Sequence, residues 1–364
     1  MQPHLPATQL AVIQAVEPPG SLVVSPDRSL PIIGPDQVLV KVFAVALNPC
    51  DWKMPTNFPT PGAGDGSDFT GEIVALGDGV RQSNPHFSVG DRVAGAVHAS
   101  NPLNPSSGCF AEYVVAYADL IWKVPAIMSW EQAAAIGGCV IGSLGLGLFE
   151  TLALPASPEK PTGKPFFVLV YGGSTASGTM AIQLLKLCGI RVITTCSPKN
   201  FPLVAKYGAE KAFDYSSSTC ATDIRAYTRN SLEYALDIIA DARSIRVCED
   251  AIGRGGGRYV GFERLPDEIL SGGGRRTVQW NWVLGITMTG QKIDLGAGYG
   301  SEPNPQRRLF GKQWFLTVQR LVDNGLIMAH PQKVNQGGLD AVPRGVELMR
   351  KKGVSGEKMV YRIA

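Results

Sequence analysis

The sequence predicts an α/β protein with two domains, a β-rich domain followed by a doubly wound parallel sheet. The chain has 364 residues, and because a domain averages roughly 150 residues, two hydrophobic cores are expected. Residues 1 to about 125 carry short β-branched and aromatic runs between turns, which is typical of a small sandwich or barrel. From Pro165, apolar strand-like runs alternate with helical segments, which indicates right-handed βαβ crossovers.

The composition is that of a globular protein without a strongly charged surface. Hydrophobic residues make up 45% of the chain and charged residues 18%, and the 42 glycines and 26 prolines stay below the ~25–30% that marks low-complexity sequence. The formal net charge is +3, with no basic stripe and no acidic tail. These values argue against nucleic acid and membrane surfaces as partners.

Cysteine usage and the N-terminal sequence predict a cytoplasmic protein. The seven cysteines are odd in number, widely spaced and never in a CxxC pair, which is typical of free thiols in a reducing compartment and argues against a zinc site of paired cysteines. The first residues lack the basic and apolar regions of a secretory signal.

In the β-rich part we expect strands at residues 37–45, 69–76, 89–95 and 110–115. The next part of the sequence is typical of helices. A helix is expected to start at Ser129, because acidic and amide residues follow this serine. An apolar run over residues 133–149 has no charge, but it falls short of the ~20 residues that span a bilayer. We interpret it as a buried helix and loop. A proline-rich stretch at 155–165 predicts a surface linker.

In the α/β part, short apolar runs typical of strands alternate with segments typical of helices. Strands are expected at residues 166–170, 191–196, 211–214, 235–239 and 257–261. Helices are expected at residues 179–188, 200–207, 313–324 and 339–352, with a last strand at 358–362.

A glycine-serine turn, Tyr171-Gly-Gly-Ser-Thr-Ala-Ser-Gly178, stands between the first of these strands and its helix. In this position a glycine turn lets the backbone approach a pyrophosphate, which then rests on the N–H groups of the helix N-terminus. The regular GxGxxG spacing is absent, and the hydroxyls of Ser174, Thr175 and Ser177 can replace some of the missing contacts. The alternative is a purely structural strand-to-helix turn.

The second strand predicts which dinucleotide is bound. An NAD site usually ends this strand with an acidic residue for the ribose 2′-hydroxyl. Here the strand is followed by Ser197-Pro198-Lys199-Asn200, which lack a carboxylate and suit a 2′-phosphate. The sequence therefore predicts NADPH, unless Ser197 and Pro198 serve only to cap the next helix.

These motifs resemble those of a known superfamily, the zinc-independent, quinone-oxidoreductase-like medium-chain dehydrogenase/reductases. The glycine segment 167–184 and the turn Asn48-Pro49-Cys50-Asp51 match in register. Within that superfamily the sequence is most similar to the trans-acting enoyl reductases of fungal highly reducing polyketide synthases, the lovastatin-pathway type. The motifs on which this similarity rests are residues 171–176, 196–201, 212–215 and 354–358.

The resemblance implies a Rossmann doubly wound sheet and a GroES-like β-rich catalytic domain. It implies a catalytic domain at residues 1–138, an NADPH-binding domain at 139–309, and a C-terminal segment at 310–364 that rejoins the first. The implied cofactor-binding residues are Cys50, Asp51, Trp52, Lys53, Ser174, Thr175, Ala176, Ser177, Ser197, Pro198, Lys199, Asn200, Tyr215, Phe262, Glu263, Val354 and Ser355. The implied acyl-pocket residues are Cys139, Val140, Ile141, Gly142, Ser143, Leu144, Gly145, Leu146, Trp282, Val283, Leu284, Gly285 and Ile286.

Two of these assignments have a structural alternative. Tyr215 is expected to pack on the adenine, but it is also the kind of tyrosine that ends an ordinary half-buried strand. The five glycines of residues 137–147 leave room for an acyl chain, but small residues also allow close helix packing.

The chemistry implied by the resemblance needs no metal. Zinc-dependent relatives carry a Gly-His-Glu segment, where this chain has Gly66-Ser67-Asp68, and its four histidines show no ligand spacing. Lys53 is the expected catalytic side chain, for orientation or polarisation, with cofactor binding as its alternative role. A tyrosine acid of mitochondrial-type reductases has no counterpart at Phe58 or Pro59, so the proton is expected to come from water.

The resulting expectation is an NADPH-dependent enoyl reductase that acts on carrier-bound polyketides. Its partner would be a polyketide synthase or PKS-NRPS megasynthase with its acyl carrier domain, and the enzyme itself a monomer or homodimer. The alternatives are a free-standing quinone or enone reductase, and a non-catalytic dinucleotide-binding scaffold on a megasynthase.

Overall fold

The computed structural model describes residues 5–351 and 353–363. The chain divides into two compact units, one comprising the residues up to Gly142 together with those from Ile286 onward, and the other comprising Ser143–Gly285. The first is β-rich and the second holds a parallel sheet, which confirms the predicted fold class. Residues 286–309, which the sequence analysis placed in the nucleotide-binding domain, lie in the first unit. Their irregular chain folds back on itself, where Ile293 and Ser301 exchange backbone hydrogen bonds.

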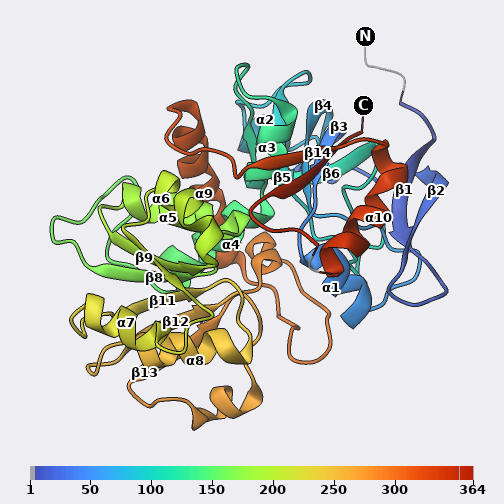
Figure 1. The fold of residues 1–364 in the computed structure, drawn as a ribbon. Coiled ribbons are helices and arrows are strands. Elements are labelled where there is room, and N and C mark those ends of the chain that lie inside the picture. The colour runs from blue at the N-terminus through green and yellow to red at the C-terminus, as the bar shows by residue number, and fades with distance from the viewer. Residues whose placement is uncertain (1–4, 352, 364) are drawn as a thin grey trace. The chain divides into compact units, whose positions relative to one another are not determined.

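A seven-stranded sheet forms the centre of the first unit. Its strands are, in order, β14 (Gln332–Asn335), β15 (Lys358–Arg362), β3 (Gln37–Ala46), β4 (Asp68–Leu76), β5 (Arg92–Ala96) and β7 (Ile121–Lys123), with β6 (Tyr113–Tyr117) also paired to β3. The last strand of the chain pairs directly with β3, so in Figure 1 the red C-terminal strands lie beside a blue one. Strand β3 is buried on both faces: its valines join the main core, whereas Ala44 and Ala46 pack against alanines of α3 (Trp130–Ile136).

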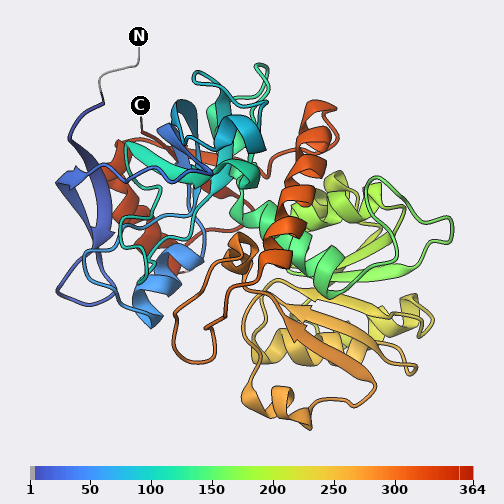
Figure 2. The same ribbon diagram turned by 180° about the vertical axis from the view of Figure 1, so that it is seen from behind.

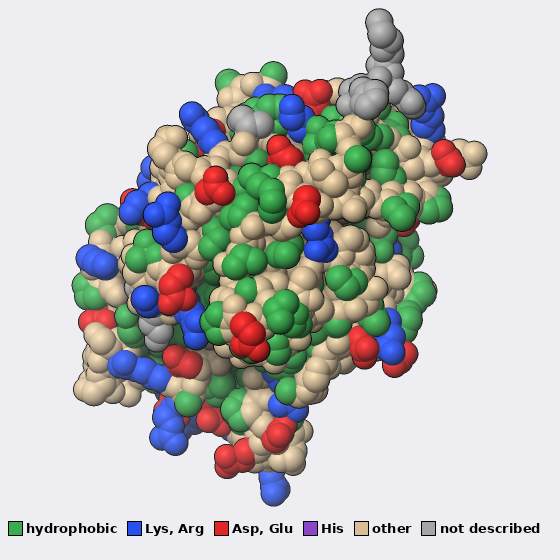
Figure 3. Space-filling view, turned by 90° about the vertical axis from the view of Figure 1, so that its right-hand side faces the viewer, with side chains coloured by type: hydrophobic (Ala, Val, Ile, Leu, Met, Phe, Trp, Pro, Cys, Tyr) green, Lys and Arg blue, Asp and Glu red, His purple; other side chains and the backbone are tan. Residues whose placement is uncertain are grey.

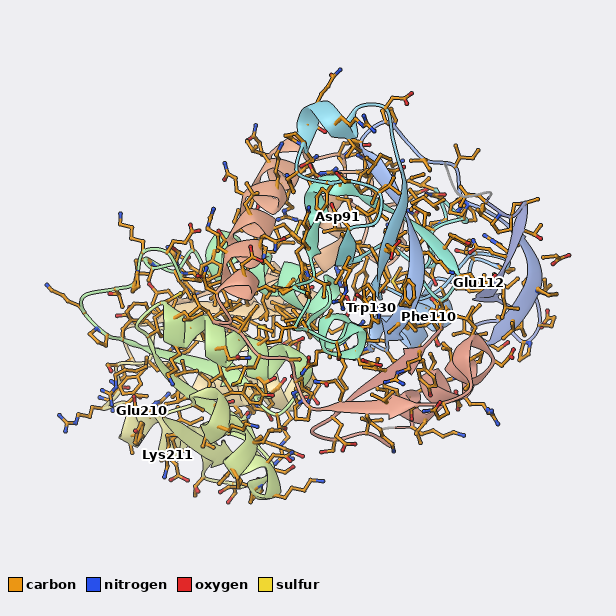
Figure 4. All side chains as sticks on the ribbon, turned by 90° about the horizontal axis from the view of Figure 1, so that it is seen from above. Asp91, Phe110, Glu112, Trp130, Glu210 and Lys211 are labelled. Carbon is orange, nitrogen blue, oxygen red and sulfur yellow. The ribbon has the colours of Figure 1, made fainter. Side chains whose placement is uncertain are left out.

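Helices cover this sheet at its ends and faces. They are α1 (Cys50–Asn57), α2 (Val80–Ser83), α3 (Trp130–Ile136), α9 (Pro305–Asp323) and α10 (Gly338–Arg350). The predicted start of α3 is confirmed, because Ser129 and Gln132 form a reciprocal capping box. Trp130, labelled in Figure 4, stacks on Phe43 with ring centroids 4.9 Å apart. The guanidinium carbon of Arg92 lies 4.0 Å from the centre of the Trp130 ring.

Several boundaries of the first unit differ from the predicted ones. Strand β6 begins at Tyr113 rather than Phe110, because Phe110 instead accepts a hydrogen bond from Val12 of β1 (Thr8–Gln14). The two-stranded sheet of β1 and β2 (Leu22–Ser29) was not predicted. Helix α9 begins eight residues earlier than expected, at an Asn304 cap followed by proline, a start signal that the sequence does contain. The predicted helix end at Lys352 lies outside the described residues.

The second unit contains a six-stranded parallel sheet. Its order is β10 (Lys211–Asp214), β9 (Arg191–Cys196), β8 (Phe167–Tyr171), β11 (Tyr234–Asp237), β12 (Gly257–Gly261) and β13 (Val278–Trp282). Numbered from β8 along the chain, this is the order 3-2-1-4-5-6 of a dinucleotide-binding fold. Helices α5 (Ala176–Leu187) and α6 (Phe201–Tyr207) cover one face, and α7 (Cys220–Tyr227) and α8 (Ala242–Ala251) the other (Figures 1 and 2).

The long apolar run of the sequence forms helices, as predicted. It contains the end of α3, the helix α4 (Cys139–Gly145) and a π-helical segment (Leu146–Thr151). In the part of the chain that the structure describes, residues 130–151 are the one helical stretch long and apolar enough to cross a membrane, and 78% of its apolar window is buried. That burial is typical of a core helix.

Charged groups of both signs are interspersed over the surface. On the face drawn in Figure 3, blue Lys and Arg side chains alternate with red Asp and Glu side chains. Some charged side chains form local ion pairs, such as Arg191 with Glu210, the residue that precedes β10 and is labelled in Figure 4. A mixed surface of this kind agrees with the small net charge of +3.

Candidate cofactor and substrate site

The glycine turn after β8 has the backbone geometry that a pyrophosphate-binding turn requires. Gly172 adopts a φ of +89°, in the left-handed region that favours glycine. A Cβ on Gly173 would lie 1.9 Å from Thr194 Oγ1, and one on Gly178 would lie 2.3 Å from the carbonyl oxygen of Gly172. The turn therefore needs glycine at three places for three reasons: chain reversal, close approach to β9, and close packing of helix α5.

Thr175 closes this turn and begins helix α5. Its hydroxyl donates to the Gly172 carbonyl at 2.8 Å and accepts from the Gly178 N–H at 2.9 Å. The sequence analysis predicted that this hydroxyl contacts the cofactor, but in the structure it caps the N-terminus of the helix. Ser174, Ala176 and Ser177 are half-buried beside it, at the C-terminal edge of the sheet next to the point where strand order reverses.

The segment after β9 lies beside the aromatic ring of Tyr215. This ring in turn lies near a cation, Arg243, that the sequence analysis missed. Ser197 makes no side-chain cap to the following 3-10 turn, and its Oγ instead lies 3.3 Å from the hydroxyl oxygen of Tyr215. Lys199 is exposed in that turn, and the Tyr215 ring is 36% exposed. The guanidinium of Arg243, in the first turn of α8, lies 5.7 Å from the centre of this ring. The sequence did offer one clue to Arg243, because this residue lies shortly after the fourth strand of the sheet along the chain.

Three other predicted segments of the second unit meet near the ends of β12 and β13. The Val283 N–H donates to the Gly261 carbonyl at 2.9 Å, which places residues 282–285 beside Phe262 and Glu263. A Cβ on Gly285 would lie 2.3 Å from Ser143 Oγ, so residue 143 of the predicted acyl segment is also adjacent. The structure thus brings together residues predicted separately for the cofactor and for the acyl chain.

The acyl segment itself is mostly buried. In helix α4 and the residue after it, Val140, Ile141, Leu144 and Leu146 are at most 4% exposed, whereas Cys139 and Ser143 are half-buried. Only a minority of the predicted lining residues is therefore open to a ligand in this structure. The acyl pocket stays a prediction, and close packing accounts for the small residues equally well.

In the first unit, the predicted cofactor segment forms the first turn of α1. Cys50 opens the helix, Asp51 is 1% exposed, and Trp52 packs against the core. Lys53 is half-buried, with its Nζ 5.8 Å from the centre of the Trp52 ring. Val354 and Ser355, the last predicted cofactor residues, lie in the irregular chain shortly before β15.

A buried polar network lies beneath this helix turn. Asp68 at the start of β4 accepts from Asn48 Nδ2 at 2.8 Å and from the N–H groups of Gly138 and Cys139 at 2.8 and 2.7 Å. Lys358 of β15 lies 3.2 Å from the same carboxylate, and its side chain is only 5% exposed. The ion pair thus fixes the start of α4 to two strands of the sheet.

Asp51 and Cys50 extend this network. Asp51 accepts from the Asn48 N–H at 2.6 Å and from Ser67 Oγ at 3.0 Å, and Ser67 Oγ also lies 3.3 Å from Cys50 Sγ. Burial, with the Asp68 charge nearby, raises the pKa of Asp51 to about 7. A hydrogen bond to the Cys139 thiol and burial raise the pKa of Cys50 well above its ordinary value. The sequence analysis treated Ser67 and Asp68 only as a missing metal motif.

The described residues contain no group of three side chains suited to hold a metal ion. Cys50 nevertheless has a second thiol beside it, that of Cys139, whereas the sequence analysis considered Cys50 alone. The independence from metal stays a prediction.

Comparisons with known proteins agree with this architecture. Residues 34–126 match the alcohol dehydrogenase GroES-like domain, and residues 176–266 match the zinc-binding dehydrogenase family. A trans-enoyl reductase of Thermothelomyces thermophilus is 54% identical over 99% of this chain and 98% of its own. One of Xenoacremonium sinensis is 52% identical, over 99% and 96%. Among solved structures, the CurK enoyl reductase has a TM-score of 0.76 at 18% identity, over 98% of this chain and all of its own.

Proposed function

This chain belongs to the trans-enoyl reductases of the medium-chain dehydrogenase/reductase superfamily, and on that premise we propose that it is an oxidoreductase that reduces the α,β-double bond of enoyl thioesters with NADPH. The observation that carries the proposal is the end-to-end identity with relatives named trans-enoyl reductases. The glycine turn at the point of strand reversal supports it, because a dinucleotide binds there in folds of this order.

The residues around the turn suit a nicotinamide dinucleotide with a 2′-phosphate. When bound, NADPH supplies the hydride that is added to the β-carbon of the double bond. The turn and the N-terminus of α5 would hold the pyrophosphate, since Gly173 and Gly178 let the turn pack closely against β9 and the start of α5, and a helix N-terminus offers backbone N–H groups to an anion. Ser197 and Lys199 offer a hydroxyl and a cation where an NAD-specific protein carries a carboxylate, and Tyr215 offers an exposed ring to the adenine.

We further propose that the substrate is a polyketide chain held as a thioester on the acyl carrier domain of a polyketide synthase or PKS-NRPS megasynthase. The deciding assay measures NADPH consumption with a short series of enoyl-pantetheine thioesters, the same chains on a carrier protein, and simple quinones. We expect turnover of the thioesters, faster on the carrier protein, with negligible activity on quinones. Turnover of quinones or small enones alone would identify a free-standing reductase instead. No oxidation of NADPH with any substrate would leave a non-catalytic scaffold.

Replacing Lys199 with alanine is expected to weaken NADPH binding about tenfold while leaving NADH binding unchanged, because one charge-assisted contact to the 2′-phosphate is lost. Dissociation constants of both nucleotides, measured by fluorescence titration, check this. Lys206→Ala is the matched control, since Lys206 is an exposed lysine of the next helix, α6. A preference for NADH that survives Lys199→Ala would contradict the assignment.

Replacing Lys53 with alanine is expected to raise the KM for NADPH or to lower kcat by about tenfold, the size of one lost charge-assisted hydrogen bond. Lys41→Ala is a matched control, because Lys41 Nζ also lies 5.8 Å from the centre of an aromatic ring, that of Phe43, but on an exposed strand position. Steady-state kinetics of both variants decide the matter. Unchanged kcat and KM in Lys53→Ala would remove Lys53 from the site.

A further inference from the structure

An arginine at the start of helix α8 lies beside the tyrosine that follows strand β10. The guanidinium carbon of Arg243 lies 5.7 Å from the centre of the Tyr215 ring. The hydroxyl oxygen of the same tyrosine lies 3.3 Å from Ser197 Oγ. Ser197 is the first residue after β9, where folds of this order recognise the 2′ position of the ribose. Tyr215 therefore connects Arg243 to the predicted 2′-phosphate site, and all three residues lie in the second unit.

The Arg243 guanidinium is free to meet a ligand. Its side chain is exposed, and within residues 5–351 and 353–363 it forms no hydrogen bond and no ion pair. It is also not stacked on the Tyr215 ring. The guanidinium carbons of Arg92, Arg191 and Arg308, which do stack on aromatic rings, lie 4.0, 4.1 and 3.9 Å from the ring centres. At 5.7 Å, Arg243 keeps its donors unused beside the ring.

The backbone of Arg243 is held in place by the cap of helix α8. Asp241 Oδ1 accepts from the Arg243 N–H at 3.0 Å and from the Ser244 N–H at 2.8 Å. In return, the Asp241 N–H donates to Ser244 Oγ at 2.9 Å. This reciprocal capping box fixes the first turn of the helix. The Arg243 side chain therefore starts from a fixed point while its charged end remains unpaired.

We propose that Arg243 binds the 2′-phosphate of NADPH as a second cation beside Lys199, and so determines the preference for NADPH over NADH. This inference rests on the proposed NADPH-dependent function. A planar guanidinium binds two phosphate oxygens through parallel hydrogen bonds, whereas the ammonium group of a lysine acts as a point charge. NADH carries a hydroxyl group where NADPH carries this phosphate. Arg243 therefore adds affinity for NADPH alone.

Two carboxylates lie near Arg243, and both already have hydrogen-bond donors. Asp241 caps α8, and Asp214 accepts from the Ser216 hydroxyl at 2.6 Å and from the Ser216 N–H at 2.8 Å. These two bonds and, to a smaller extent, the charge of Arg243 lower the pKa of Asp214. A role confined to offsetting the Asp214 charge is the structural alternative. It predicts no difference between the two nucleotides.

Nucleotide binding by the full-length protein tests the assignment. Dissociation constants of NADPH and NADH are measured by fluorescence titration for the wild type, Arg243→Gln and Arg243→Lys. We expect Arg243→Gln to weaken NADPH binding about tenfold and to leave NADH binding unchanged, because one charge-assisted contact to the phosphate is lost. Arg243→Lys should recover part of the loss, since it keeps the charge without the planar fork.

Arg246→Gln is the matched control, because Arg246 is an exposed arginine one turn further along α8. It should bind both nucleotides like the wild type. A second measurement isolates the phosphate: calorimetric titration with adenosine 2′,5′-bisphosphate and with adenosine 5′-monophosphate. The wild type should bind the bisphosphate more tightly, and Arg243→Gln should lose about tenfold for the bisphosphate only. The double variant Arg243→Gln with Lys199→Ala should bind both ligands with nearly equal affinity.

The outcomes separate this inference from the proposed function. Equal weakening of NADPH and NADH in Arg243→Gln would show that Arg243 acts on the adenine or on the Tyr215 ring, and would overturn the assignment. An unchanged preference of Arg243→Gln for the bisphosphate would do the same. A wild type that binds the bisphosphate no better than the monophosphate would overturn the NADPH assignment together with this inference. A wild type that shows the expected binding but reduces no enoyl thioester would overturn the proposed reaction alone.

Discussion

Replacing Gly178 with alanine is expected to weaken NADPH binding by about 10²-fold. The added Cβ would lie 2.3 Å from the Gly172 carbonyl oxygen and 2.6 Å from backbone atoms of Gly173. Those neighbours are backbone rather than flexible side chains, so the turn and the start of α5 must separate. Overpacking of this kind costs about 1–3 kcal/mol, and every ~1.4 kcal/mol that falls on the cofactor site is a tenfold loss of affinity.

The measurement is the NADPH dissociation constant by fluorescence titration, which does not depend on a substrate. Gly163→Ala is the matched control in the same unit, because a Cβ at Gly163 meets no atom within 4 Å. It should bind NADPH like the wild type. If Gly178→Ala also binds NADPH normally and remains folded, the pyrophosphate does not rest on this turn.

Replacing Lys358 with methionine is expected to destabilise the first unit by about 3–5 kcal/mol, which is typical when one partner of a buried ion pair is removed. Lys358 lies 3.2 Å from Asp68, and their side chains are 5% and 0% exposed. Without the ammonium group, the Asp68 carboxylate stays buried with only neutral donors, such as Asn48 Nδ2 at 2.8 Å. The expected result is therefore a loss of stability rather than a change of cofactor preference.

Urea denaturation followed by tryptophan fluorescence measures this effect, because four of the six tryptophans, Trp52, Trp122, Trp130 and Trp314, lie in the unit that contains the ion pair. Lys351→Met is the control, because Lys351 pairs with Glu347 at 3.3 Å while 72% exposed, and such a pair contributes about 1 kcal/mol or less. The double variant Lys358→Met with Asp68→Asn should recover part of the loss, since the unpaired charge is gone. Equal unfolding midpoints for Lys358→Met and the control would show that the ion pair does not hold the sheet together.

The elements of the second unit were predictable because their signals are local. Parallel strands buried on both faces appear as short continuous apolar runs, and the structure places β9, β10 and β12 at the predicted residues. The glycine turn was identifiable for the same reason, since its residues are adjacent in sequence. The strands β1 and β2 were missed because their burial is irregular: β2 contains Pro26 and no alternating face, and β1 has an irregular register after Gln9.

The site of the first unit required the tertiary structure. Asp51 and Ser67 are 16 residues apart in sequence, and Asp68 and Lys358 are 290 apart. No spacing rule connects them, because they meet only where β3, β4 and β15 pair and where α4 begins. Ser67 and Asp68 were noticed in the sequence, but only because they stand where a metal-binding motif would be. The sequence analysis therefore assigned them no role. Lys358 was noted only as the start of the predicted last strand and as part of a motif of the resemblance.

By itself, the sequence determined the fold class, five of the six strands and the first two helices of the nucleotide-binding unit, and the three glycines of its turn. These depend on periodicity and on backbone conformation, which neighbouring residues specify. The tertiary structure alone decided that Asp51 is buried beside Asp65 and Asp68, that Lys358 neutralises one of these charges, and that Cys50 meets Cys139. Those facts depend on burial and on pairwise distance, and both are set only when distant segments pack into one core.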